Sequence, residues 1–314
     1  MPPDYLLAAY SALILLASLL GGWIPLWVRL THTRLQVATS FVAGLMLGVG
    51  LLHLLPHAWH QLRAIDRTMG WVLAGFVTMF FIQRFFQFHQ HEVAEETHEH
   101  PDLDQGSDHV HQDSSAGCEH TTHRLSWAGA AAGLTLHTVI DGVALAASVA
   151  SETTGQMTSA VAGLGTFLVI ILHKPFDAMT IGTLLAAGGW SRGVRHLINA
   201  AFALAIPLGV LFFHACAVQY GPREHVLVGA ALAFAAGTFL CIAGSDLLPE
   251  LHFHTHDRVK LSLALLAGVA LAILVGQFEH AGHDQTPRQR GQASLEIPAV
   301  SWLPPTLHLI RPSS

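Results

Sequence analysis

The sequence contains few charged residues. Asp, Glu, Lys and Arg together make up 11% of the 314 residues, whereas soluble globular proteins contain roughly 25%. Hydrophobic residues make up 52%, and they recur in apolar stretches of about 20 residues, the length that an α-helix needs to cross a bilayer. The scarcity of charge argues against a soluble domain, and the apolar stretches predict an all-α, polytopic protein of the lipid bilayer.

Other absences exclude further classes. The three cysteines, Cys118, Cys216 and Cys241, are too few and too widely spaced for a disulfide framework or a CxxC zinc site. No GxxxxGK[ST] motif occurs, so the chain does not supply its own ATPase site. The first apolar stretch lacks a preceding basic segment, so we expect a retained membrane helix and not a signal peptide. Nothing in the charge pattern favours a nucleic-acid partner.

Eight transmembrane helices are predicted. The apolar stretches lie at about 5–28, 37–59, 69–88, 125–149, 157–187, 195–219, 225–251 and 259–278. In a bilayer each must be helical, because the backbone has to satisfy its own hydrogen bonds there. In this topology, eight of the Lys and Arg residues in the short connections lie on one side of the membrane and three on the other. This asymmetry predicts that both termini lie outside the cytoplasm.

The predicted organisation has four parts. Residues 1–88 form the first three spans, 89–124 a cytoplasmic loop, 125–283 the remaining five spans, and 284–314 a flexible tail. Nine acidic residues and no Lys or Arg occur in residues 89–123, which predicts a disordered loop that attracts cations. Its histidines, among them His98, His100, His109 and His111, are candidates for metal capture. The alternative is a solvated tether.

Two of the predicted spans resemble each other. AGLMLGVGLLHLLPHAWH (43–60) aligns without a gap to AGTFLCIAGSDLLPELHF (236–253), which pairs His53 with Asp246 and His57 with Glu250. In the predicted topology these two helices run in opposite directions, so the similarity predicts an inverted repeat of spans 1–3 and 6–8 around spans 4 and 5. The four polar residues are candidates for a transport path. The alternative is chance similarity between Leu-rich helices.

Two neighbouring predicted spans each carry a His and an Asp four residues apart. These are His137 and Asp141 in the fourth span, and His173 and Asp177 in the fifth. Residues at this spacing share one helical face. If the helices face each other, two imidazoles and two carboxylates converge, a ligand set that suits zinc, with iron(II) or manganese also compatible. The alternative is that each pair is a hydrogen bond between helices. Pro175, inside the fifth span, predicts a kink because it cannot donate to the carbonyl of Ile171.

These motifs resemble the ZIP (Zrt/Irt-like) family of divalent-metal transporters. The resemblance rests on HTVIDG in the fourth span, HKPFDA in the fifth and GTFLCIAGSDLLPEL in the seventh, and it covers roughly residues 5–280. It implies that the two His–Asp pairs form the primary transport site. Thr138 stands where the family commonly has Asn, and Lys174 stands where an acidic residue completes a second metal site. An ammonium offers no lone pair to a metal, so we expect one metal ion, with Lys174 paired to Asp141 or Asp177.

The expected function is therefore transport of a divalent metal, zinc first, into the cytoplasm without ATP hydrolysis. The metal is the substrate, and no cofactor or enzymatic activity is expected. An intramembrane zinc hydrolase of the ceramidase-like type is an alternative, although it needs three histidines and an open coordination position. A cation exporter is a third. We expect a multi-pass protein of the plasma or bacterial inner membrane. The sequence does not determine the oligomeric state, and a homodimer is one of the states that it allows.

Overall fold

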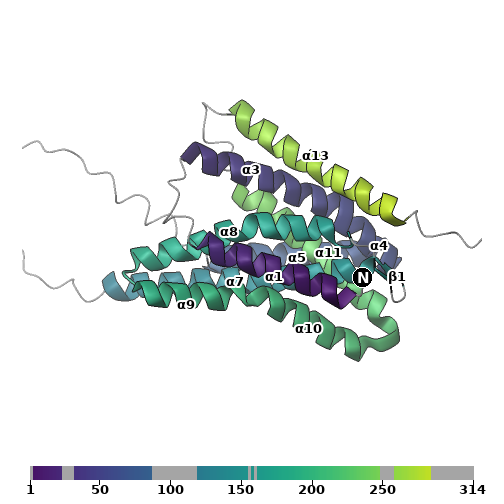
Figure 1. Cartoon of the computed structure of the whole chain (residues 1–314), viewed down its shortest axis with the longest axis horizontal. Coiled ribbons are helices and arrows are strands. Elements are labelled where there is room, and N and C mark those ends of the chain that lie inside the picture. Colours follow the sequence, from purple (N-terminus) through teal and green to yellow (C-terminus); the bar gives the residue numbers. More distant parts are fainter. Residues whose placement is uncertain are drawn as a thin grey trace, which may run out of the picture.

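The chain folds into a bundle of helices (Figure 1). The computed structural model describes residues 3–22, 32–86, 119–154, 157–158, 161–247 and 258–283. In chain order its principal helices are α1 (Pro3–Gly21), α3 (His32–Val49), α4 (Leu55–Leu62), α5 (Ile65–Phe86), α7 (Glu119–Ser151), α8 (Leu164–Ala187), α9 (Arg192–Ala203), α10 (Ala205–Tyr220), α11 (Glu224–Ile242) and α13 (Arg258–His283). Two-residue strands, β1 (Thr153–Thr154) and β2 (Met157–Thr158), pair antiparallel between α7 and α8.

Most of these helices are long and apolar enough to cross a membrane. Within the described residues, seven segments meet this criterion by length and composition. One of them, Arg192–Ser245, has 54 residues and would measure about 80 Å as a straight helix, against about 30 Å for the hydrocarbon core of a bilayer. It turns back at Gly221, which has φ of 50°, and so contains α9 and α10 on one side of the turn and α11 on the other. The chain is an all-α polytopic membrane protein.

Most of the helices run along the long axis of the molecule (Figure 1), and their contacts divide them into two groups. In the first helix group, α1 packs along α8, α10 packs along α7, and α9 contacts both α1 and α8. In the second helix group, α3 packs along α13, α5 packs along α11, and α4 also packs on α11. The groups meet where α11 and α5 contact α7 and where α3 contacts α8. A continuous buried apolar core spans both groups.

The second helix group is held by close contacts at glycines. A methyl group added at Gly44 of α3 would overlap the carbonyl oxygen of Leu265 in α13, and one added at Gly268 would overlap the carbonyl oxygen of Phe41. In the same way, Gly237 of α11 lies against the carbonyl of Val72 in α5, and Gly75 lies against the carbonyl of Phe234. Small residues permit this approach of helix backbones in membrane proteins.

Both copies of the predicted repeat contain a π-helical turn. One is η1 (Gly50–Leu54), between α3 and α4, and the other is η3 (Ala243–Leu247), after α11. Each is followed two residues later by a proline, Pro56 or Pro249, in the sequence. π-Helical turns within α-helices are rare and occur frequently at functional sites.

Two predicted spans differ from the structure. The fifth was expected from residue 157, but α8 begins at Leu164, because Met157–Thr158 form strand β2, paired with β1, and Gly163 has a left-handed φ of 69°. The sixth, expected as one helix over 195–219, is divided at Leu204 into α9 and α10. Pro207 explains this division, since it has no N–H to donate to the carbonyl of Ala203.

Helix α7 also begins earlier than the fourth span was expected to begin. It starts at Glu119, inside the range 89–124 predicted as a loop. Hydropathy marks only the apolar part of a helix and does not detect polar first turns, which explains the difference. Pro175 lies inside α8, which continues from Leu164 to Ala187 around it.

Candidate metal site

The two predicted His–Asp pairs face each other in the middle of the bundle. His137 is the tenth residue of the 24-residue segment Ala128–Ser151, and His173 is the tenth residue of the 24-residue segment Leu164–Ala187. These two segments are joined by the short β1–β2 connection and run antiparallel, so both pairs lie near mid-span. We call His137, Thr138, Asp141, His173, Lys174 and Asp177 the mid-span cluster.

Three ligand atoms of this cluster lie close enough together to bind one ion. Single ligand atoms of His137, His173 and Asp177 all lie within 4.8 Å of one another. The Nε2 atoms of His137 and His173 lie 3.9 and 3.8 Å from Oδ2 of Asp177. Ligands around a tetrahedral zinc ion are about 3.3 Å apart, given zinc–ligand bonds of about 2.0–2.1 Å. A small inward movement of these side chains would therefore complete three coordination bonds.

The imidazole of His173 is oriented for this role. Its Nδ1 lies 2.8 Å from the carbonyl oxygen of Val169, one turn earlier in α8. Only an N–H can make this hydrogen bond, so Nδ1 is the donor and, in the neutral ring, Nε2 keeps its lone pair. Metal-binding histidines commonly hold their second ring nitrogen in this way.

Lys174 lies at the centre of the cluster. Its Nζ donates to Oδ2 of Asp141 at 2.7 Å and to Oδ2 of Asp177 at 2.8 Å. It also donates to Oγ1 of Thr138 at 3.0 Å, and this hydroxyl in turn donates to the carbonyl oxygen of Leu134 at 2.7 Å. An ammonium has three N–H donors, and all three have an oxygen acceptor here. Lys174 thus contacts both aspartates, where the sequence predicted one or the other.

The cluster is almost entirely shielded from solvent. Thr138, Asp141 and Lys174 have no exposed surface, and His137 and His173 retain 3% and 6%. The Asp177 side chain retains 17% and is the most accessible member. Asp141 has a further role in the geometry, since its Oδ2 also lies 3.4 Å from Nε2 of His137 and 3.3 Å from Nε2 of His173. Charged groups at this depth are costly and mark ion pathways in membrane proteins.

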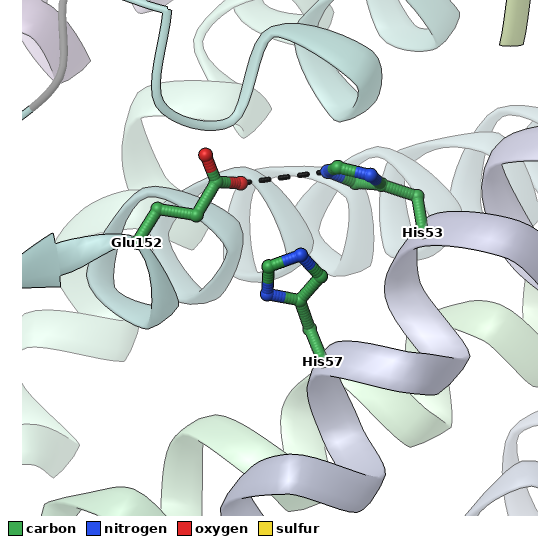
Figure 2. A group of neighbouring side chains, drawn as sticks. All are labelled: His53, His57 and Glu152. Carbon is green, nitrogen blue, oxygen red and sulfur yellow. Dashed lines mark ion pairs between the residues drawn. The ribbon is translucent and has the colours of Figure 1, made fainter. Parts of the chain in front are cut away.

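A second group of ligand side chains occurs where α7 ends. His53 on η1, His57 on α4 and Glu152 place one ligand atom each within 4.8 Å of one another (Figure 2). The Nε2 of His53 lies 3.4 Å from Oε1 of Glu152, and the rings of His53 and His57 have centroids 4.8 Å apart. We call these three residues the end cluster. Both histidines were predicted from the sequence, but Glu152 was not. A single acidic residue at the end of an apolar stretch belongs to no recognisable motif.

The remaining predicted site residues are not placed by the structure. Asp246 belongs to η3, but the position of its side chain is not described. Glu250 lies outside the described residues. The same holds for the loop histidines, His98, His100, His109 and His111.

A bundle of apolar helices with imidazoles and carboxylates buried at mid-span is typical of membrane proteins that move ions. Residues 5–276 of the chain match the family described as ZIP Zinc transporter, so the chain belongs to this family. The protein is accordingly an integral, multi-pass metal-ion transporter and not an enzyme.

Known proteins from distant organisms are similar to the chain over most of its length. Zinc transporter ZIP9-B of Xenopus laevis is 28% identical over 87% of this chain and 97% of its own length. Zinc transporter ZIP13 of Mus musculus is 28% identical over 84% of this chain and 73% of its own length. Zinc transporter 3 of Arabidopsis thaliana is 22% identical over 84% of this chain and 82% of its own length.

Proposed function

We propose that the protein moves zinc into the cytoplasm through the mid-span cluster between α7 and α8, without ATP hydrolysis. The observation that carries this proposal is the convergence of His137, His173 and Asp177 on one buried point, in a chain whose relatives are named zinc transporters. Imidazole and carboxylate ligands also accept iron(II) and manganese, so ligand type alone does not set the preference.

The mid-span cluster is proposed to bind one metal ion at a time. Lys174 contacts the Oδ2 atoms of Asp141 and Asp177, and its Nζ is also 3.4 Å from Nε2 of His173. These are atoms that an incoming ion would use. A bound ion therefore shares the aspartates with the ammonium, which takes the place of a second ion and supplies one positive charge there. Thr138 and Pro175 tune the site, Thr138 as an acceptor for Lys174.

The path is proposed to continue on both sides of the mid-span cluster. His53 and His57 would lie on the entrance side, and Asp246 and Glu250 on the exit side. The loop that contains His98, His100, His109 and His111 would then collect or sense the metal in the cytoplasm. With this orientation both termini are outside the cytoplasm, and the host is a plasma or bacterial inner membrane. A homodimer is compatible with this arrangement.

An inverted repeat is proposed to build the second helix group. Each residue in the first copy lies 193 positions before its counterpart, as Gly44 does before Gly237. The contact of Gly44 with Leu265 then corresponds to the contact of Gly237 with Val72, and η1 corresponds to η3 residue for residue. This agreement supports a repeat and, with it, eight spans. Inverted repeats around a midplane site are typical of secondary transporters.

Uptake measurements on the purified protein test this function. Proteoliposomes should accumulate radiolabelled zinc without ATP, and parallel assays with iron(II) and manganese define the preference. Expression in cells should raise cytoplasmic zinc reported by a fluorescent indicator. A fall in cytoplasmic zinc would support the exporter alternative, and an absence of any metal flux into proteoliposomes would contradict the proposal.

A further inference from the structure

The geometry points to a second divalent-metal site at the end cluster, formed by His53, His57 and Glu152, which fastens the two helix groups to each other when occupied. Beyond the proposed transport site, this is the other place in the described residues where three or more His, Cys, Asp or Glu ligand atoms converge closely enough for one ion. Figure 2 shows the three side chains directed toward a common point from two segments of the chain.

The ligand set suits zinc or a similar ion. Two imidazoles and one carboxylate are a known protein ligand set for zinc, with a fourth position left for water. His53 and Glu152 retain 4% and 3% of their surface, so their ligand atoms are removed from bulk water. A carboxylate buried beside two imidazoles favours a cation, because each of the three side chains offers a lone pair toward the same point.

Neighbouring groups hold these ligands in place. The backbone N–H of Gly163 donates to Oε1 of Glu152 at 3.2 Å, which orients the carboxylate. The hydroxyl of Ser151 lies 3.5 Å from Nδ1 of His57. The ring of His53 lies against Gly165, where a methyl group would touch the imidazole at 3.5 Å. Such outer contacts are typical of metal sites, where they fix ligand orientation.

The end cluster is separate from the mid-span cluster. Along α7, Asp141 precedes Ser151 by ten residues, which corresponds to about 15 Å of helix. The two clusters share no residue, and a single ion cannot contact both. A cavity of about 410 Å³ lies next to the end cluster, lined in part by Ser151 and Thr153 on either side of Glu152. The acids Asp4 and Glu224 also line this cavity, which gives cations an attractive approach.

The end cluster lies between the two helix groups, so an ion bound there would hold them together. His53 and His57 belong to the α3–η1–α4 segment of the second helix group, whereas Glu152 directly follows α7 of the first helix group. An ion bound to all three would connect the groups by coordination bonds. Because the ion binds this arrangement of the groups and not the unfolded chain, its binding stabilises the arrangement by mass action.

The test uses full-length protein in which the mid-span cluster is disabled by His137→Ala and Asp177→Ala. After equilibration with zinc and removal of free ion, bound zinc is measured by mass spectrometry. Introducing His53→Ala and His57→Ala into this background should remove one zinc ion per chain and abolish the rise in melting temperature that zinc produces through this site. Glu152→Gln, which keeps the shape of the side chain, should weaken binding at this site at least tenfold.

His60→Ala provides the matched control, since His60 is an exposed histidine on the same helix as His57. It should leave both the zinc count and the melting shift unchanged. An unchanged zinc count in the His53→Ala/His57→Ala protein would overturn the proposal, provided that size-exclusion profile and circular dichroism match the background. Because transport through the mid-span cluster is already disabled in the background, the result is independent of the proposed function.

Discussion

The Nζ atom of Lys174 on α8 lies 2.7 Å from Oδ2 of Asp141 on α7, and neither side chain has any exposed surface. This contact joins the two helices that carry the proposed transport site, at the depth where the metal would bind. The ammonium therefore acts as a built-in cation that neutralises part of the carboxylate charge before any ion arrives. Removing one member of a buried ion pair leaves the other charge uncompensated, which costs more than the pair contributes.

Replacing a proposed ligand should abolish transport. Asp177→Ala or His137→Ala removes one of the three converging ligand atoms, and zinc uptake into proteoliposomes should fall to less than about a tenth. Even residues that only support metal ligands change affinity by about 10–100-fold when they are replaced. His60→Ala is the control, because His60 is an exposed histidine on α4. Normal uptake by both ligand variants would refute the site assignment.

Lys174→Ala should make the protein dependent on metal for its stability. Without the ammonium, Asp141 and Asp177 are two buried carboxylates with no cation between them, and we expect a loss of about 3–5 kcal/mol in the absence of metal. Zinc should restore much of this loss by taking the place of Nζ. Thermal unfolding in detergent, with zinc and with a chelator, measures both effects. A variant as stable as the parent in chelator would show that Lys174 is not the structural cation.

Lys174→Glu should raise the number of metal ions bound at the mid-span cluster from one to two. The substitution replaces a positive donor with an additional carboxylate ligand, the residue type that the resemblance to the family places at this position. Because the end cluster is proposed to bind zinc as well, the count is made in a His53→Ala/His57→Ala background. Two ions per mid-span cluster in the protein that retains Lys174 would contradict the proposed single-metal site.

The paired glycine contacts should be equally sensitive to added volume. Gly44→Val and Gly237→Val each force a side chain into a facing carbonyl oxygen, and each should lower the free energy of unfolding by about 2–3 kcal/mol. Gly70→Val is the matched control, since no atom of another helix lies within 4 Å of the position where its Cβ would be. If the control loses as much stability as the other two variants, close packing is not what these glycines provide.

Deleting residues 92–116 should leave transport largely intact. This deletion removes most of the predicted metal-capturing loop and ends before α7 begins at Glu119. Uptake should retain its maximal rate while its dependence on external and internal zinc concentration changes. Complete loss of transport by a well-expressed deletion variant would show instead that the loop is part of the path.

Much of the site could be predicted from the spacing of residues within single helices. His137 and Asp141, like His173 and Asp177, are four residues apart, and this spacing alone places each pair on one face. The pairing of Lys174 with an aspartate followed from its sequence position next to His173 and from the cost of an isolated charge in a membrane.

The rest depends on contacts between segments that are distant in sequence. Glu152 has significance only because the fold brings His53 and His57, about 100 residues earlier, beside it. The π-helical turns and the close glycine contacts likewise arise from packing between helices, which local hydropathy does not encode. The division between α9 and α10 at Leu204 could have been predicted from Pro207. It was missed because the sequence is apolar on both sides of the break, so hydropathy indicates one continuous span.

The ammonium of Lys174 also has an electrical consequence. Counted with two ionised aspartates and neutral imidazoles, the empty mid-span cluster carries one net negative charge, and the same cluster with a divalent ion carries one net positive charge. If the cluster moves through the electric field of the membrane, the field would therefore drive it in one direction when a metal ion is bound and in the opposite direction when it is empty. A unit charge that crosses the whole field gains or loses about 2.3 kcal/mol per 100 mV. A membrane potential that is negative inside would thus favour inward movement of the loaded cluster and outward return of the empty one.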